Sequence, residues 1–304
     1  MTSAESMPET TRVPWGAVAT FLVIAFALAW VVTLPLWIGG EGLRSPLALP
    51  LMAAMMWTPT VAALVATFFV RRPRRRAHYL GLVPFRPVGR KIALFLLFPV
   101  AWTAIAVASL LLAAALGWAH PDWSLSQIAP FLPEGMTADV YMAVTLAAIP
   151  VNTVVATVSA FGEELGWRGF LTTALAPLGF WPSAILIGIV WGLWHAPVIL
   201  LGYNFARPDA AGLALMVVFT LFVGVILQWS RYWTGNVWPA AVGHGALNTA
   251  ASVVVLWNGP GDDAAIATVL GAPGWIVMGV VIALLVVTGL LGRRTRTALE
   301  AVPA

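Results

Sequence analysis

Residues 141–168 read YMAVTLAAIPVNTVVATVSAFGEELGWR, and this stretch decides the fold class of the chain. Its first three quarters contain no charged side chain and are long enough for a helix that crosses a bilayer, which takes about 20 residues. Two adjacent carboxylates, Glu163 and Glu164, and the guanidinium of Arg168 follow directly. An ionisable side chain inside a bilayer costs several kcal/mol unless it is paired or hydrated, so such residues usually mark function. We therefore expect a membrane-spanning helix that carries part of a functional site.

The rest of the chain has the same apolar character. Of its 304 residues, 61% are hydrophobic and only 9% are charged, whereas soluble domains carry about 25% charged residues. Apolar runs of spanning length recur, and we count about eight: Trp15–Ile38, Leu47–Val70, Ile92–Trp118, Tyr141–Phe161, Pro182–Leu201, Gly212–Trp229, Val237–Trp257 and Trp275–Leu291. The predicted fold class is all-α, a polytopic transmembrane helical bundle of about eight spans without a second soluble domain.

The distribution of basic residues predicts the orientation in the membrane. If the N-terminus is cytoplasmic, 14 of the 16 Lys and Arg residues lie on the inner side, and only Arg44 and Arg207 lie on the outer side. Cytoplasmic loops of membrane proteins carry such an excess, so we predict that both termini face the cytoplasm. The basic run at 71–76 is then a topology signal beside anionic lipid headgroups. We expect a lipid bilayer around the protein and no nucleic acid as a partner.

The predicted organisation is simple. A polar cytoplasmic tail at 1–14 precedes a transmembrane bundle at 15–292, and a basic cytoplasmic tail follows at 293–304. The residues that carry the chemistry lie at about 141–257. The chain contains no Cys, which excludes disulfides, thiol catalysis and Cys-ligated zinc. We expect an integral membrane protein of the plasma (inner) membrane of a bacterium.

Helical spacing assigns different roles to the two glutamates. At about 100° per residue, Asn152, Ser159 and Glu163 form a polar stripe, which must face protein or a water-filled cavity. Glu164 and Arg168 are four residues apart, the spacing of an ion pair. We therefore expect Arg168 to hold Glu164 ionised, which leaves Glu163 free to act as a general base. The alternative is that both glutamates are solvated at the cytoplasmic end of the helix and pair with Arg168.

A histidine interrupts the fifth apolar run, which reads GIVWGLWH from Gly188 to His195. Gly188 and Gly192 form a small-xxx-small pair that lets a neighbouring helix approach closely, and His195 lies on nearly the same face. Trp191 precedes His195 by one turn and can pack over the imidazole, while Pro197 is expected to kink the helix. The alternative for His195 is a hydrogen-bonded core residue without a functional role.

A second histidine lies in the seventh run. His244 and Asn248 are one turn apart and project the same way. The amide of an Asn, together with a His, can hydrogen-bond an oxyanion or orient a water. The alternative for Asn248 is a hydrogen bond that joins two helices. The other two histidines, His78 and His120, lie in loops and are assigned no role.

Together, a glutamate, two histidines and an asparagine from three helices are the components of a hydrolytic site: a base that activates water, imidazoles that bind a metal or polarise a carbonyl, and an amide for the oxyanion. For Glu163 and His195 to share this site, the fourth helix must continue past Arg168, or the fifth must begin later or be tilted. Two other classes of protein compete with this interpretation. A proton-coupled transporter also places Glu and His within its spans, and a membrane scaffold would need no chemistry.

The same residues resemble the motifs of the CAAX-protease and bacteriocin-processing family (CPBP, ABI) of intramembrane endopeptidases. That family shows Glu-Glu-x-x-x-Arg, an aromatic residue followed by x-x-x-His, and His-x-x-x-Asn/Asp, each on a separate helix. Here the motifs read Glu163-Glu164-Leu-Gly-Trp-Arg168, Trp191-Gly-Leu-Trp-His195 and His244-Gly-Ala-Leu-Asn248. Trp191 stands where the family usually has Phe, a departure that we read as conservative. By this resemblance the three motifs supply the catalytic residues.

The resemblance implies a role for each group. Glu163 would activate the attacking water, assisted by His195, and His244 with Asn248 would stabilise the oxyanion. In a metalloprotease variant, Glu163, His195 and His244 would instead bind Zn²⁺, which accepts N and O donors. The sequence leaves both kinds of activated water open. We expect a peptidase whose cavity opens toward the cytoplasm and whose substrate is a peptide or a membrane-anchored protein.

Overall fold

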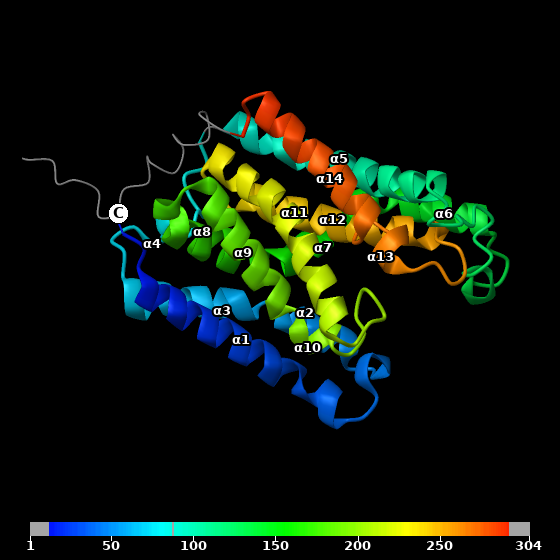
Figure 1. The fold of residues 1–304 in the computed structure, drawn as a ribbon, viewed down its shortest axis with the longest axis horizontal. Coiled ribbons are helices and arrows are strands. Elements are labelled where there is room, and N and C mark those ends of the chain that lie inside the picture. Colours follow the sequence, from blue (N-terminus) through cyan, green and yellow to red (C-terminus); the bar gives the residue numbers. More distant parts are fainter. Residues whose placement is uncertain (1–11, 87, 292–304) are drawn as a thin grey trace, which may run out of the picture.

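The computed structural model describes residues 12–86 and 88–291, and within these ranges the chain is built from helices without a strand (Figure 1). The predicted all-α class of a polytopic helical bundle is thereby confirmed. The predicted tails at 1–14 and 293–304 lie outside the described residues, except for residues 12–14, and they stay predictions. The orientation of both termini toward the cytoplasm also stays a prediction.

Long helices form the frame of the bundle: α1 (Trp15–Ile38), α5 (Val88–Ala115), α11 (Ala210–Thr234), α12 (Trp238–Val254) and α14 (Ala272–Val287). The other helices lie between them: α2 (Ala48–Met55), α3 (Thr58–Val65), α4 (Arg76–Tyr79), α6 (Ala138–Ala147), α7 (Ile149–Glu164), α8 (Thr172–Leu175), α9 (Phe180–Trp194), α10 (Ala196–Ile199) and α13 (Ala264–Ala267). The stretches Ala66–Arg71 and Leu165–Leu171 are π-helical, and single 3₁₀ turns lie at Gly42–Arg44, Ala129–Phe131, Ala176–Leu178 and Val255–Trp257.

All eight predicted apolar runs form helices, but eight separate spans are not confirmed. Among the described residues, six helical segments are long and apolar enough to cross a bilayer, and one bent pair can add a seventh. In that pair, α6 and the helical segment that begins with α7 meet at a bend of 58°. The fifth run is divided into the 15 residues of α9 and the 4 residues of α10, and each is shorter than a spanning helix usually needs to be.

Proline explains both irregular runs. Pro150 lies in the first turn of α7, directly after the bend, and Pro197 lies in the first turn of α10. A proline lacks the amide N–H, and its ring clashes with the carbonyl four residues earlier, so it starts a helix but interrupts one that precedes it. The kink predicted at Pro197 is confirmed, since α9 ends at Trp194 and His195 caps it.

The fourth predicted helix does not end near Phe161, which corrects its predicted boundary. It continues through α7, the π-helical stretch Leu165–Leu171 and α8 as far as Leu175. The π-helical stretch is buried throughout, so Glu163 and Arg168 lie well inside the bundle. The continuation past Arg168 removes the difference in depth between Glu163 and His195 that the predicted boundary implied, and both side chains line one cavity.

Small residues bring the helices that carry the motifs close together. A Cβ placed on Gly192 of α9 would lie 2.5 Å from the Cα of Val217 in α11. A Cβ on Gly245 of α12 would lie 2.6 Å from the backbone nitrogen of Thr157 in α7. The predicted close approach at the glycines of α9 is therefore confirmed, and α12 uses the same device against α7.

The distribution of apolar and polar side chains is the reverse of that in a soluble protein. Exposed aliphatic side chains cover α1, α5 and α14, among them Val23, Val31, Leu96, Val100, Val280 and Leu284. Polar and charged groups are buried instead: Glu163, Glu164, Arg168, Gln228 and Arg231 are 0–2% exposed. A lipid environment favours this arrangement, because buried polar groups find partners that hydrocarbon does not offer.

Candidate active site

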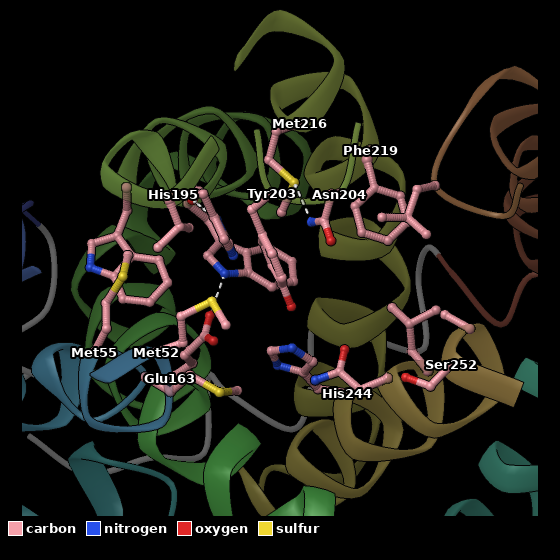
Figure 2. A pocket seen from close by; sticks show the side chains of 18 residues that line it. Met52, Met55, Glu163, His195, Tyr203, Asn204, Met216, Phe219, His244 and Ser252 are labelled. Atoms are coloured by element: carbon pink, nitrogen blue, oxygen red, sulfur yellow. Dashed lines mark hydrogen bonds between the residues drawn. The ribbon is translucent and has the colours of Figure 1, made fainter. Parts of the chain in front are cut away.

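A cavity of about 230 Å³ lies between α7, α9 and α12. Four of the predicted site residues line it: Glu163, His195, His244 and Asn248. Figure 2 shows Glu163 and His244 pointing into it from different helices. The cavity has room for several water molecules, each of which takes about 30 Å³ in the liquid. The other two predicted residues, Glu164 and Arg168, lie beside the cavity rather than in its lining.

Glu164 joins two of the motifs through one oxygen atom. Its Oε1 accepts a hydrogen bond from a guanidinium nitrogen of Arg168 at 2.9 Å, and both side chains are fully buried. The same oxygen lies 3.0 Å from Nδ1 of His244. The ion pair predicted from the spacing of Glu164 and Arg168 is confirmed. The alternative of two solvated glutamates at a helix end is wrong, because neither is more than 2% exposed.

Trp191 holds the other carboxylate. Its indole N–H donates to Oε2 of Glu163 at 2.6 Å, and the guanidinium carbon of Arg168 lies 4.3 Å from the centroid of its ring. The predicted packing of Trp191 on His195 is loose, with ring centroids 6.0 Å apart, and Trp194 is the nearer ring at 4.9 Å. Trp191 is thus a hydrogen-bond donor to Glu163 and a cation–π partner of Arg168.

His195 presents one free ring nitrogen. Its Nδ1 lies 2.8 Å from the backbone oxygen of Trp191. A carbonyl oxygen only accepts, so Nδ1 carries a proton, and in the neutral ring Nε2 is left as an acceptor. The position after the last residue of α9 places this ring at the cavity wall, half-buried.

His244 is oriented by a carboxylate. The hydrogen bond from Nδ1 to Glu164 fixes the ring and leaves Nε2 for the cavity. Asn248 lies one turn further along α12 and lines the same cavity, half-buried.

The predicted polar stripe on the fourth helix does not line the cavity. Ser159 is half-buried and Asn152 is exposed, and neither contributes to the cavity wall. Asn152 lies 11 residues before Glu163, which is about 16 Å along a helix. The cavity lies at the far end of α7, so only Glu163 of this stripe reaches it.

The structure adds residues that the sequence did not indicate. Tyr203 and Asn204, from the loop between α10 and α11, line the cavity, and so do Met52, Met216 and Ser252. Figure 2 shows the Tyr203 hydroxyl reaching toward the space between Glu163 and His244. Burial, and secondarily the Glu163 carboxylate, raises the pKa of Tyr203 above its ordinary value, so the phenol stays protonated and can donate.

The proposed zinc ligands are not grouped as a metal site. Among the described residues, no three His, Cys, Asp or Glu side chains converge as metal ligands do. Because the donor set in this arrangement does not fit Zn²⁺, no chemical step is assigned to a metal.

Known proteins match this chain over the segment that contains the three motif-bearing helices. Residues 144–250, which include all six predicted site residues, match the model of a family described as type II CAAX prenyl endopeptidase Rce1-like. CAAX prenyl protease 2 of Methanococcus maripaludis is 41% identical over 44 residues, which cover 14% of this chain and 16% of that protein. The aligned segment is thus about one-sixth of the relative's length. These matches confirm the resemblance to the CAAX-protease family that the motifs indicated.

Proposed function

We propose that this chain is an intramembrane endopeptidase that hydrolyses a peptide bond with water activated by Glu163. One observation carries the proposal: Glu163, His195, His244 and Asn248 line one buried cavity although they come from three helices. The family match over residues 144–250 supports a peptidase.

Glu163 is the general base in this proposal. One carboxylate oxygen accepts from Trp191, and the other has no hydrogen-bond partner among the described residues. The free oxygen accepts a proton from a water in the cavity as that water attacks the carbonyl carbon. Nε2 of neutral His195 accepts the second hydrogen of the water and so orients it.

His244 and Asn248 serve the developing oxyanion. Protonated His244 donates from Nε2, and Asn248 donates from its amide, toward the carbonyl oxygen of the substrate. Glu164 holds His244 through Nδ1, and Arg168 in turn neutralises Glu164. The proton taken up by Glu163 then passes to the leaving amine, so the base becomes the acid of the second step.

Charge balance supports these protonation states. Two ionised glutamates and one arginine leave the site with one net negative charge, and an imidazolium at His244 cancels it. A neutral cluster lowers the cost of burying four charges, because each then has an opposite charge nearby. The negative charge of the oxyanion forms as Glu163 takes up a proton and loses its own negative charge. The net charge of the site therefore stays zero.

The substrate class that we propose is a peptide or a membrane-anchored protein segment. The Methanococcus relative is named CAAX prenyl protease 2, and the buried Glu163 carboxylate in this chain supports a substrate whose peptide bond enters the cavity. The bilayer surrounds the site, so the substrate must be presented at or within the membrane.

The test is hydrolysis of a mixture of internally quenched peptides by the purified protein in lipid. We expect Glu163→Ala, His195→Ala and His244→Ala each to abolish hydrolysis while the protein stays folded in detergent. Ser159→Ala is the matched control, because Ser159 lies one turn before Glu163 outside the cavity and should keep wild-type activity. Full activity of the Glu163→Ala protein would contradict the proposal.

A further inference from the structure

The cavity has a buried floor and an open rim. Glu163, Trp191 and His244 form the floor and are at most 5% exposed. Tyr203 is 38% exposed and Ser252 is exposed at the rim. Access to Glu163 therefore comes from the side on which Tyr203 and Ser252 lie.

All rim residues belong to one end of the bundle. Met52 lies one turn into α2, Tyr203 lies in the loop before α11, Ser252 lies near the end of α12, and Leu270 lies just before α14. Figure 1 shows α2, α10 and α13 toward one end of the molecule and α4 at the other. The chain direction agrees: α2 begins at the rim end, and the helical segment that it opens runs to Arg71 at the opposite end.

The opposite end carries the basic residues. The connector at 71–76 contains five arginines, and Arg90 at the start of α5 lies at the same end. The rim end carries Arg44, shortly before α2, and Arg207, which is paired with Asp263. An excess of basic residues marks the cytoplasmic side, so the charge distribution predicts that the rim faces away from the cytoplasm. From the sequence we predict a cavity that opens toward the cytoplasm. The position of the rim argues against that prediction.

We infer that the substrate enters from the non-cytoplasmic face of the membrane. The peptide that reaches Glu163 is a membrane-proximal segment of an exported or surface-anchored protein, or a peptide arriving from outside. The cleavage itself rests on the proposed function, whereas the side of access rests on the cavity and the charge distribution.

The lining also restricts the chemistry of that segment. Methionines and aromatic rings form the walls, and Asn204, Asn248 and Ser252 supply uncharged polar groups. No Lys or Arg is among the described residues that line the cavity. The walls therefore favour a segment with apolar and uncharged polar side chains.

The absence of Cys from the chain makes the side of access measurable. Ser252→Cys places a thiol at the exposed rim, and Ala77→Cys places one on the exposed surface of α4 at the arginine-rich end. Each single-cysteine protein is treated in intact bacterial cells with a membrane-impermeant maleimide, before and after permeabilisation. The cysteine-free wild type is the blank.

We expect the maleimide to label Ser252→Cys in intact cells and Ala77→Cys only after permeabilisation. Labelling of Ala77→Cys in intact cells would overturn the inference. So would a Ser252→Cys protein that reacts only after permeabilisation.

A second measurement separates the side of access from the proposed hydrolysis. An impermeant, internally quenched peptide is added to right-side-out and to inverted membrane vesicles that contain the wild-type protein, with Glu163→Ala vesicles as the blank. Hydrolysis in right-side-out vesicles supports the inference, and hydrolysis only in inverted vesicles overturns it. No hydrolysis in either, even after detergent, counts against the proposed function, while the labelling result still decides the side of access.

Discussion

Trp191 shows how one residue connects the separate motifs of the site. Its N–H donates to Glu163, its ring faces Arg168 at 4.3 Å, and its backbone oxygen accepts from His195. From the sequence, Trp in place of Phe was read as a conservative departure. The structure corrects this interpretation, since a phenyl ring has no N–H to donate. A hydrogen-bond partner 28 residues away cannot be read from helical spacing, because spacing relates only residues on one helix.

Trp191→Phe should isolate the contribution of this donor. The ring remains to cover Arg168, so we expect a similar KM, while the loss of a buried hydrogen bond lowers the melting temperature slightly. A hydrogen bond to a charged group contributes about 1.5–3 kcal/mol, so kcat should fall by about 10- to 100-fold. Steady-state kinetics of the purified variant in lipid checks this. A kcat equal to wild type would show that the indole N–H does not position Glu163.

Removing one partner of the Glu164–Arg168 pair should destabilise the protein as well as inactivate it. Each partner is fully buried, so Arg168→Ala leaves a carboxylate without its cation at a cost of about 3–5 kcal/mol. Thermal unfolding in detergent measures the loss. The double variant Glu164→Gln/Arg168→Gln should recover part of the stability without activity. If Arg168→Ala melts with the wild type, the pair does not hold the site.

The metal content provides an independent check at the same scale. The described His and Glu side chains do not group as metal ligands, so we expect metal removal by a chelator to leave peptide hydrolysis unchanged. Elemental analysis before and after dialysis against the chelator measures how much metal the protein holds in each activity assay. Stoichiometric zinc that is lost together with activity, and lost again in His195→Ala and His244→Ala, would show that the metallo form of the mechanism is correct.

At the scale of elements, the sequence predicted the helices well and their ends poorly. The apolar run beginning at Trp15 matches α1 at both ends. The composition predicts an end of the fourth run at Phe161, where the apolar residues stop. The helix continues to Leu175, since Glu164 pairs with Arg168 inside the bundle and the charged turn can stay buried. The π-helical stretch Leu165–Leu171 has no signature in the sequence that we recognised.

The close packing of α12 on α7 should tolerate no added side chain. A Cβ on Gly245 would meet the backbone of Thr157 at 2.6 Å, and overpacking of this kind costs about 1–3 kcal/mol. Gly245→Ala should therefore lower the melting temperature and, because His244 is its neighbour, lower activity too. Gly16→Ala in α1 is the control, since its Cβ would meet nothing within 4 Å. Equal melting temperatures for the two variants would contradict this account of the helix contact.

At the scale of the whole molecule, the convergence of distant motifs was predictable and the enclosure of the cavity was not. Three polar motifs on apolar helices had to face one another, because lipid offers polar groups no partners. Tyr203, Asn204 and Met52 reach the cavity from a loop and from the start of α2. Such positions follow no periodicity, so only tertiary structure reveals them. The same holds for the side on which the cavity opens.

The most direct test of the central claim is the rate of peptide hydrolysis by Glu163→Gln in lipid. Gln keeps the shape of Glu and retains an oxygen that can accept from Trp191, but it removes the base. General-base catalysis contributes about 10²- to 10⁴-fold, so the account predicts a loss of that size at an unchanged melting temperature. Hydrolysis at the wild-type rate by the folded Glu163→Gln protein would contradict it.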